Sequence, residues 1–447
     1  MNKRLLLLNV ITMCVITSVV FSQCGTQKKK RTEADESGSP NAWDASIREN
    51  SREMIEKGRA VFRFETFGDE AFWTDKLLLH KIIPDRERGG IGDGLTPRMA
   101  LDLGLKVDLD ILPMPLREQI KEGKLFNDVG LTLTLLKLNA VVGIVGKFED
   151  GNLKSIGITC ALCHSTVDNP TGIGSRLDGW PNRDLDVGKI VSSAPNLTPL
   201  TEMLDVDVAT LKKALESWGP GKYDAELNFD GKAFRPDGKT AATLIPEAFG
   251  HLGHNNHTWT GGRGSVTYWN AYVANTQMMG QGIFYDPRLM DEKQYPVGAR
   301  EKLGNKRDAQ DLISDKLAAL HFYQLAMPAP KAPKDSYDEN AAERGKSVFN
   351  GKAQCASCHV PPLFTEPGWN THTPEEIGID DFQASRSPER TYVTQGLKGL
   401  WAHSKGGFYH DGRFATLMDV VNHYNSFKKL NLTEAEKKDL IEYLKSL

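Results

Sequence analysis

The sequence predicts a mainly α fold made of two domains, and three observations support this. Sustained alternation of apolar and polar residues, which is typical of strands, is rare along the chain. The segments EKGRAVF (56–62) and ERGKSVF (343–349) share a pattern in which Gly and Phe fall four residues apart, on one face of a helix. Between these two copies lies AMPAPKAPKD (326–335), which is rich in proline and is typical of a linker.

Composition narrows the class of protein. The 447 residues exceed the usual size of one domain. Lys and Arg number 55 against 58 Asp and Glu, for a net charge of −3, and the folded part lacks a long basic run, so nucleic acid is not an expected partner. A hydrophobic content of 40% is ample for apolar cores, and a mean hydropathy of −0.40 excludes a polytopic membrane protein.

The N-terminus has the pattern of an export signal. Lys3 and Arg4 precede an apolar stretch at residues 5–21, which polar residues make a poor membrane span. We expect a signal peptide at 1–23 and a flexible tether at 24–43. Cys24 is a candidate for lipid attachment, although Gln23 departs from the small residue usual before such a cysteine, and a plain cleaved signal or an uncleaved anchor are the alternatives. The expected location is the periplasm, or a membrane anchor facing it.

Two short motifs carry the chemistry. TCALCH (159–164) and QCASCH (354–359) each contain a cysteine pair with two intervening residues, followed directly by histidine. A strained disulfide, a thioredoxin-like site and a zinc ion held by four thiolates are alternatives, but none requires that histidine. Histidine accounts for only 11 of the 447 residues, so its presence after both pairs is not expected by chance.

C-x-x-C-H is the attachment signature of c-type haem, in which two thiols bind the vinyl groups and the histidine binds the iron. Haem c is attached after export, which agrees with the N-terminal signal. We therefore expect two covalently attached haems c, held by four cysteines and two proximal histidines: Cys160, Cys163, Cys355, Cys358, His164 and His359.

The motifs divide the chain into two cytochrome c-like haem domains, at 44–330 and 335–447. The second is compact and ends in LTEAEKKDLIEYLKSL, in which Thr433 and Glu436 have capping-box spacing. The first carries a large insertion, because a long segment separates its Gly-Phe helix from Cys160. Within this insertion, LTLTLLKLNAVVGIVGKF (131–148) is expected to be buried, and its periodicity fits both helix and strand.

From residue 335 onward the chain resembles the C-terminal domain of the bacterial dihaem cytochrome c peroxidase superfamily, which includes the enzymes that mature methylamine dehydrogenase. The resemblance rests on CASCH (355–359), RTYVTQGLKGL (390–400), GFYHDGRFATL (407–417) and DVVNHYN (419–425). It implies that Tyr424 occupies the position of the sixth iron ligand, usually Met, as in the maturation enzymes. Two alternatives remain. His423 beside it could be the ligand, or Tyr424 could only pack against its neighbours without binding the iron.

The first domain matches the superfamily only in TCALCH and in scattered fragments. In this superfamily the catalytic acid is a Glu followed by Met. The resemblance therefore implies Glu202, which precedes Met203, as the catalytic acid, but the rest of the family's motif around it is missing. His251, His254 and His257 lie in a Gly- and Asn-rich loop. We name His257 as the candidate sixth ligand of the first iron, and the alternative is a set of solvent-exposed loop histidines.

Two functions remain open. The first is electron transfer by a dihaem cytochrome between redox partner proteins of the periplasm, with each potential set by the sixth ligand and by burial. The second is a peroxidase-like oxidoreductase that reduces hydrogen peroxide with electrons from a small donor, which requires an open distal position and a nearby acid. Whether the protein is an enzyme thus depends on the sixth ligand of each iron.

Overall fold

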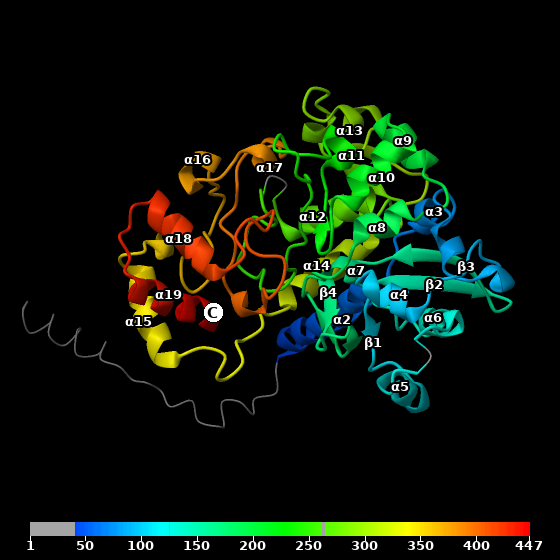
Figure 1. Cartoon of the computed structure of the whole chain (residues 1–447), viewed down its shortest axis with the longest axis horizontal. Helices are drawn as coiled ribbons and strands as arrows, with labels where there is room; N and C mark the ends of the chain where they lie inside the picture. The colour runs from blue at the N-terminus through cyan, green and yellow to red at the C-terminus, as the bar shows by residue number, and fades with distance from the viewer. Residues whose placement is uncertain (1–40, 125, 262–263) are drawn as a thin grey trace, which may run out of the picture. The chain divides into compact units, whose positions relative to one another are not determined.

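The computed structural model describes residues 41–124, 126–261 and 264–447. The predicted signal peptide, Cys24 and most of the predicted tether lie outside the described residues. By its internal contacts the chain divides into a unit that ends at Arg52 and a unit from Glu53 to Leu447, which contains both C-x-x-C-H motifs. Figure 1 shows the course of the chain and labels its helices and strands. In the part of the chain that the structure describes, no helix is both long enough and apolar enough to cross a membrane.

The fold is mainly α, as the sequence predicts. Helices up to the proline-rich segment are α2 Ala42–Phe64, α3 Glu70–Trp73, α4 Pro97–Asp102, α5 Met114–Lys121, α6 Val129–Lys137, α7 Ala161–His164, α8 Val187–Ser192, α9 Thr198–Leu204, α10 Val208–Glu216, α11 Leu227–Asp230, α12 Val266–Tyr272, α13 Pro296–Arg300 and α14 Leu317–Ala326. Those after it are α15 Glu339–Asn350, α16 Pro374–Ile377, α17 Phe382–Ser385, α18 Leu417–Phe427 and α19 Glu434–Ser446.

Short helical turns complete the chain: η2 Leu79–Ile82, η3 Arg86–Arg88, the π-helical η4 Val273–Gln277, η5 Pro287–Met290, η6 Ser314–Lys316, η7 Cys355–Ser357 and η8 Leu400–Ala402. Five two-stranded sheets occur among the described residues. One is parallel, between β1 Val107–Asp108 and β5 Ile173–Gly174. The antiparallel pairs are β2 Ile144–Glu149 with β3 Asn152–Ile158, β4 Ser165–Val167 with β6 Arg176–Asp178, β7 Lys222–Tyr223 with β8 Thr243–Leu244, and β9 Ile283–Tyr285 with β10 Asn305–Arg307.

The sequence repeat corresponds to a repeated crossing of two helices. Gly58 of α2 approaches α14 so closely that a Cβ atom would lie 2.0 Å from the carbonyl oxygen of Ala319. Gly345 of α15 meets α19 in the same way, with 2.0 Å from a built Cβ to the carbonyl oxygen of Asp439. Glycine is therefore required at both crossings because any side chain would collide with backbone.

An aromatic pair accompanies each crossing. Phe62 of α2 meets Tyr323 of α14 edge to face, with ring centroids 5.7 Å apart. Phe349 of α15 meets Tyr443 of α19 at 5.2 Å in the same geometry. Helix α19 begins with the capping box expected at Thr433, whose hydroxyl accepts from the Glu436 amide while the Glu436 carboxylate accepts from the Thr433 amide. The repeat seen in the sequence is therefore also a repeat of the three-dimensional structure.

The segment at 131–148, which periodicity could not assign, contains both kinds of structure. Helix α6 ends at Lys137, and strand β2 begins at Ile144 and pairs with β3. Leu131, Leu135 and Leu136 of the helix are buried. Strand β3 leads directly to the first C-x-x-C-H motif, so this part of the insertion helps to position it.

Each apolar core is built from residues of one part of the chain only. The core that contains Phe349, Val421, Leu440 and Leu444 is built only from residues after the proline-rich segment. The other three cores are built from residues between 55 and 329. The domain boundaries at 44–330 and 335–447 stay predictions, but among the described residues no apolar core joins residues from both.

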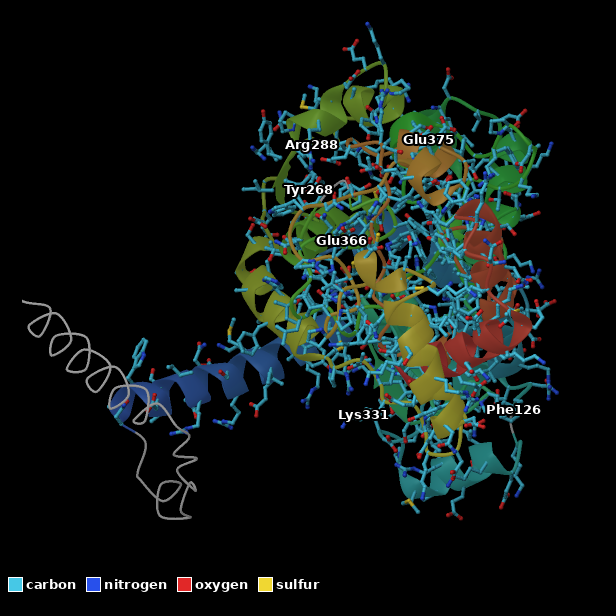
Figure 2. All side chains as sticks on the ribbon, turned by 90° about the vertical axis from the view of Figure 1, so that its left-hand side faces the viewer. Phe126, Tyr268, Arg288, Lys331, Glu366 and Glu375 are labelled. Carbon is cyan, nitrogen blue, oxygen red and sulfur yellow. The ribbon has the colours of Figure 1, made fainter. Side chains whose placement is uncertain are left out.

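Charged groups are among the contacts that connect the two halves. The guanidinium of Arg386, which is 1% exposed, donates to Asp230 at 2.7 Å and pairs with Asp224 at 3.0 Å. Arg288 lies over the ring of Tyr268, at 5.6 Å from its centroid (Figure 2). It also pairs with Glu389 at 2.5 Å. Removing one partner of a buried pair such as that of Arg386 typically costs about 3–5 kcal/mol, because the other charge is left without compensation.

Gly58→Ala should lower the free energy of unfolding by at least roughly 1–3 kcal/mol, because its Cβ would overlap the backbone of α14 and no side-chain rotation can relieve that overlap. Urea denaturation of the haem-loaded protein measures the change. Gly92→Ala is the matched control, since a Cβ there meets nothing within 4 Å. Equal stability of the two variants would contradict the close crossing.

Candidate haem-binding site

The first motif forms a single tight turn at the end of β3. Helix α7 begins directly after Cys160, and the amide of His164 donates to the carbonyl of Cys160 at 3.1 Å, which closes the turn. Cys160 and Cys163 are free thiols and are partly buried. Burial raises the pKa of each thiol to about 12, so both are protonated rather than thiolate at neutral pH.

The imidazole of His164 is fixed by a backbone group from a distant segment. Its Nδ1 donates to the carbonyl oxygen of Pro246 at 3.1 Å. Burial lowers the pKa of His164 to about 4, so the ring is neutral and Nε2 can offer a lone pair. Histidine ligands of metals usually donate their second ring nitrogen to a carbonyl or carboxylate in this way.

The second motif repeats this arrangement with a local partner. The turn η7 contains Cys355, and the amide of His359 donates to the carbonyl of Cys355 at 2.9 Å. The Nδ1 of His359 donates to the carbonyl oxygen of Phe364 at 3.2 Å. Burial lowers the pKa of His359 as well. Cys355 and Cys358 are also free thiols.

This donor set fits c-type haem better than the alternatives. None of the four described cysteines is in a disulfide, so the structure gives no support to a structural disulfide across either pair. In each motif the thiols and the imidazole share one turn, and the imidazole is oriented by a bond at Nδ1, leaving Nε2 for an iron. A four-thiolate zinc site would leave both oriented imidazoles without a role.

Tyr424 lies near the second motif, whereas its rival His423 is engaged elsewhere. Both are on α18, and Tyr424 packs in the same apolar core as Cys355. Burial raises the pKa of Tyr424, and the two thiols of the motif act in the same direction, which places them nearby. The Nε2 of His423 donates to the carbonyl of Ile377 at 2.8 Å, and its ring stacks on Phe427. Of the two, Tyr424 has the position suited to a sixth ligand.

The three loop histidines lie together, and His257 is only 6% exposed, so the alternative of solvent-exposed histidines does not hold for it. They follow Pro246 in the chain, whose carbonyl oxygen accepts from Nδ1 of His164. His257 as the sixth ligand of the first iron stays a prediction.

Glu202 lies in α9 and is exposed. A carboxyl group that donates a proton during catalysis has to lie beside the reacting group, whereas the side chain at this position faces solvent. The structure therefore gives Glu202 no feature of a distal acid.

Sequence reasoning missed a buried contact between a glutamate and a histidine, next to the backbone group that orients His164. Glu247 follows Pro246, and its carboxylate lies 3.4 Å from Nε2 of His403 in the second half of the chain. Burial alone would raise the pKa of Glu247, but His403 and Arg183 outweigh it and lower the pKa to about 2. In the sequence this glutamate stands in EAFG (247–250). Nothing near it in the sequence indicates that it contacts His403, because that contact forms only in the folded chain.

Two tryptophans join the surroundings of the two motifs. Trp180 follows Gly179, whose amide donates to the carbonyl of His164 at 2.8 Å. Its ring meets that of Trp401 edge to face, with centroids 5.6 Å apart. Leu400, next to Trp401, packs in the core that contains Cys355. The indole rings therefore form a direct contact between the neighbourhoods of the two attachment turns.

Comparison with known proteins supports this chemistry. No protein-family model matches the chain. It is 29% identical over 153 residues to the methylamine utilization protein MauG of Methylorubrum extorquens, a match that covers 29% of this chain and 43% of that relative. It is 25% identical over 266 residues to the cytochrome-c peroxidase IdrP1 of Pseudomonas sp. strain SCT, which covers 47% of this chain and 68% of the relative.

Similar solved structures include a MauG-like protein associated with microbial copper homeostasis, with 19% identity, a TM-score of 0.31 and coverage of 48% of this chain and 76% of that chain. Another is the dihaem peroxidase BthA from Burkholderia thailandensis, with 17% identity, a TM-score of 0.31 and coverage of 52% and 78%. Scores this low carry no argument about the fold.

Two thiol pairs, each with an oriented imidazole, and these curated relatives define the class: the protein is a dihaem c-type cytochrome with two covalently attached haems c. Within that class, its resemblance to the superfamily of MauG and the dihaem cytochrome c peroxidases is confirmed. The MauG match spans less than half of that relative, so substrates and partners are not transferred with it.

Tyr424→Phe should change the absorption spectrum and the reduction potential of one haem, because it removes the only oxygen of the side chain expected to face the second iron. Redox titration followed by absorption measures both quantities. His423→Gln is the matched control on the same helix, and it should leave the haem spectrum unchanged because His423 is bonded to Ile377. Identical spectra for Tyr424→Phe and the native protein would remove Tyr424 as a ligand.

Proposed function

We propose that the protein transfers electrons between two haems c in the cell envelope. The first haem would be attached through Cys160 and Cys163 with His164 as proximal ligand, and the second through Cys355 and Cys358 with His359. When bound, each haem supplies a one-electron redox centre whose potential depends on its axial ligands and burial.

The observation that carries the proposal is the bond that both proximal imidazoles make at Nδ1. The bonds to Pro246 and Phe364 hold each ring in a single tautomer with Nε2 as the metal-binding nitrogen. Such bonds raise the basicity of the ligand and keep its orientation constant in both oxidation states. A small change in geometry on electron transfer is what a carrier needs.

The contact between Trp180 and Trp401 supports electron exchange inside the molecule. The two rings belong to different halves of the chain and touch between the neighbourhoods of the attachment turns. The Nε1 of Trp401 donates to the carbonyl of Pro330 at 3.0 Å, so its ring is held in place by the proline-rich segment. Two indole rings in contact fill part of the space between the two attachment turns. An electron that moves between the haems then crosses a shorter gap through empty space.

Peroxidase-like reduction of hydrogen peroxide is the second candidate, and the names of the curated relatives favour it. It requires an open distal position and a proton donor close to it. Glu202, the acid implied by the sequence, is exposed, and Glu247 lies on the proximal side of His164 with a pKa of about 2, too low for a donor. The arrangement of the described residues therefore favours electron transfer.

For location and partners, we propose export to the periplasm with redox proteins as partners, and membrane attachment through lipid on Cys24. The apolar N-terminal stretch before Cys24 supports this. Sequencing the N-terminus of the mature protein tests it, since a first residue beyond Cys24 would exclude the lipid while leaving export intact.

Trp401→Leu should slow the equilibration of an electron between the two haems, because it removes one ring of the contact. Stopped-flow absorption after addition of one reducing equivalent measures the rate, and haem content and both potentials should stay unchanged. Trp369→Leu is the matched control, since Trp369 is 68% exposed. Unchanged equilibration in Trp401→Leu would exclude the aromatic contact as the route.

Hydrogen peroxide should be consumed by the half-reduced protein no faster than by free haem at the same concentration. A small electron donor and a spectrophotometric assay are sufficient. Glu202→Gln should have no effect, because the carboxyl group is exposed. Rapid turnover that falls by about 10²–10⁴ in Glu202→Gln, the usual cost of losing a positioned proton donor, would establish the peroxidase alternative.

A further inference from the structure

The three loop histidines form a cluster with the geometry of ligands. His251, His254 and His257 follow one another at intervals of three residues, and one ring nitrogen from each lies within 4.8 Å of the others. Ring centroids are 4.6 Å apart for His251 and His257, and 6.1 Å apart for His251 and His254. A tetrahedral ion with Zn–N bonds of 2.0–2.1 Å needs nitrogens about 3.3 Å apart, so the rings would close around the ion on binding.

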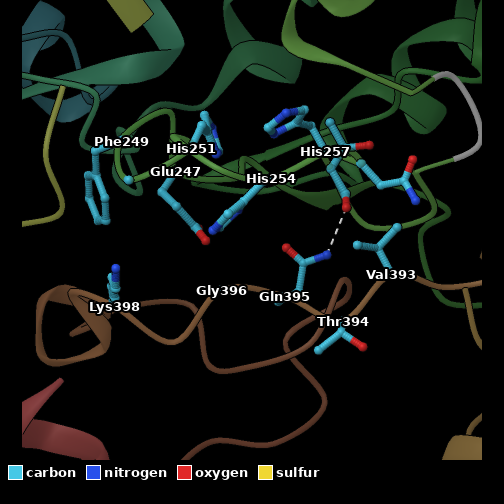
Figure 3. A pocket seen from close by; sticks show the side chains of 13 residues that line it. Glu247, Phe249, His251, His254, His257, Val393, Thr394, Gln395, Gly396 and Lys398 are labelled. Atoms are coloured by element: carbon cyan, nitrogen blue, oxygen red, sulfur yellow. Dashed lines mark hydrogen bonds between the residues drawn. The ribbon is translucent and has the colours of Figure 1, made fainter. Parts of the chain in front are cut away.

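The cavity at this cluster is the size of an ion. Its volume is about 20 Å³, which accommodates one water molecule or ion but no organic substrate. The histidines lie along one side of the cavity and Val393, Thr394 and Gln395 along the other (Figure 3). The two sides are held together by a bond of 2.7 Å from Nε2 of Gln395 to the carbonyl of Thr258.

One ring nitrogen of a buried histidine lacks a hydrogen-bond partner among the described residues. His257 is 6% exposed, and its Nδ1 has no hydrogen-bond partner in the described structure. A buried polar atom left in this state costs about 1–3 kcal/mol. The cost would be removed by a ligand that accepts the lone pair, and burial keeps the imidazoles neutral, as metal binding requires.

Two further clusters of potential ligands are already engaged by neighbouring groups. Cys358, with Glu366 and His372 beside it, belongs to the second haem motif. Asp380 and Asp411 near His410 are neutralised by Arg235 and Arg413. The histidine cluster differs from both, because it belongs to neither attachment turn and no arginine is paired with it in the described residues.

We propose that His251, His254 and His257 bind one divalent transition-metal ion, as a third metal site separate from the two haems. Three neutral imidazoles suit Zn²⁺, Cu²⁺ or Ni²⁺ rather than Ca²⁺ or Mg²⁺, which prefer oxygen ligands. The ion would fix the histidine loop where it faces residues 393–395 of the second half. The bond from the Val393 amide to the Trp259 carbonyl, at 3.0 Å, continues this contact.

Metal content of the haem-loaded protein tests the proposal. After dialysis against a chelator and then against Zn²⁺ or Cu²⁺, elemental analysis should give one added ion for every two iron atoms. His257→Ala should weaken binding by at least about 10-fold, the loss that even an outer-shell partner of a metal usually causes. His321→Ala is the matched control, because His321 bonds to Thr267 and lies outside the cluster.

Haem content and circular dichroism establish that each variant is folded. His254→Gln provides a second test if His257→Ala fails to fold, because His254 is less buried. Absence of any ion beyond iron in the native protein, or equal uptake by the native protein and a folded variant, would overturn the proposal. A change in the haem spectrum of His257→Ala without any uptake of added metal would also overturn it, because the cluster would then serve an iron.

Discussion

The bond from each proximal imidazole to a backbone carbonyl is the constraint on which the rest of the molecule depends. A haem attached through two thiols is useful only if the adjacent imidazole presents Nε2 in a fixed direction, and the bond at Nδ1 ensures this. For His359 the acceptor is Phe364, five residues away, so the second site is complete within one loop. For His164 the acceptor is Pro246, 82 residues away, so the first site exists only when the intervening chain has folded back.

This difference explains where the two halves of the chain meet. The segment that supplies the Pro246 carbonyl continues into Glu247, Phe249 and the histidine loop, and these residues contact the second half. Glu247 pairs with His403, and Gln395 donates to Thr258. Trp180, held next to His164, touches Trp401. The segment that orients His164 therefore also lies at the junction between the halves.

The sequence was sufficient for features that depend on local chemistry. The two C-x-x-C-H turns, the capping box at Thr433 and the close crossings at Gly58 and Gly345 all follow from residues near one another or from a repeat. It was insufficient where the partner is distant. The pairing of Glu247 with His403, the aromatic contact of Trp180 and the division of 131–148 into helix and strand each depend on contacts made only in the fold. The exposure of Glu202 was likewise not predictable from the sequence, because a two-residue motif carries no information about burial.

The intact mass of the mature protein after acid-acetone extraction is the most direct measurement of the central claim. Two haem masses in addition to the polypeptide are expected, because thioether bonds survive this treatment. In the double variant Cys160→Ala with Cys163→Ala, one haem mass should remain, carried by Cys355 and Cys358. A polypeptide mass without haem, particularly with zinc recovered in the extract, would contradict the assignment of both turns as haem attachment sites.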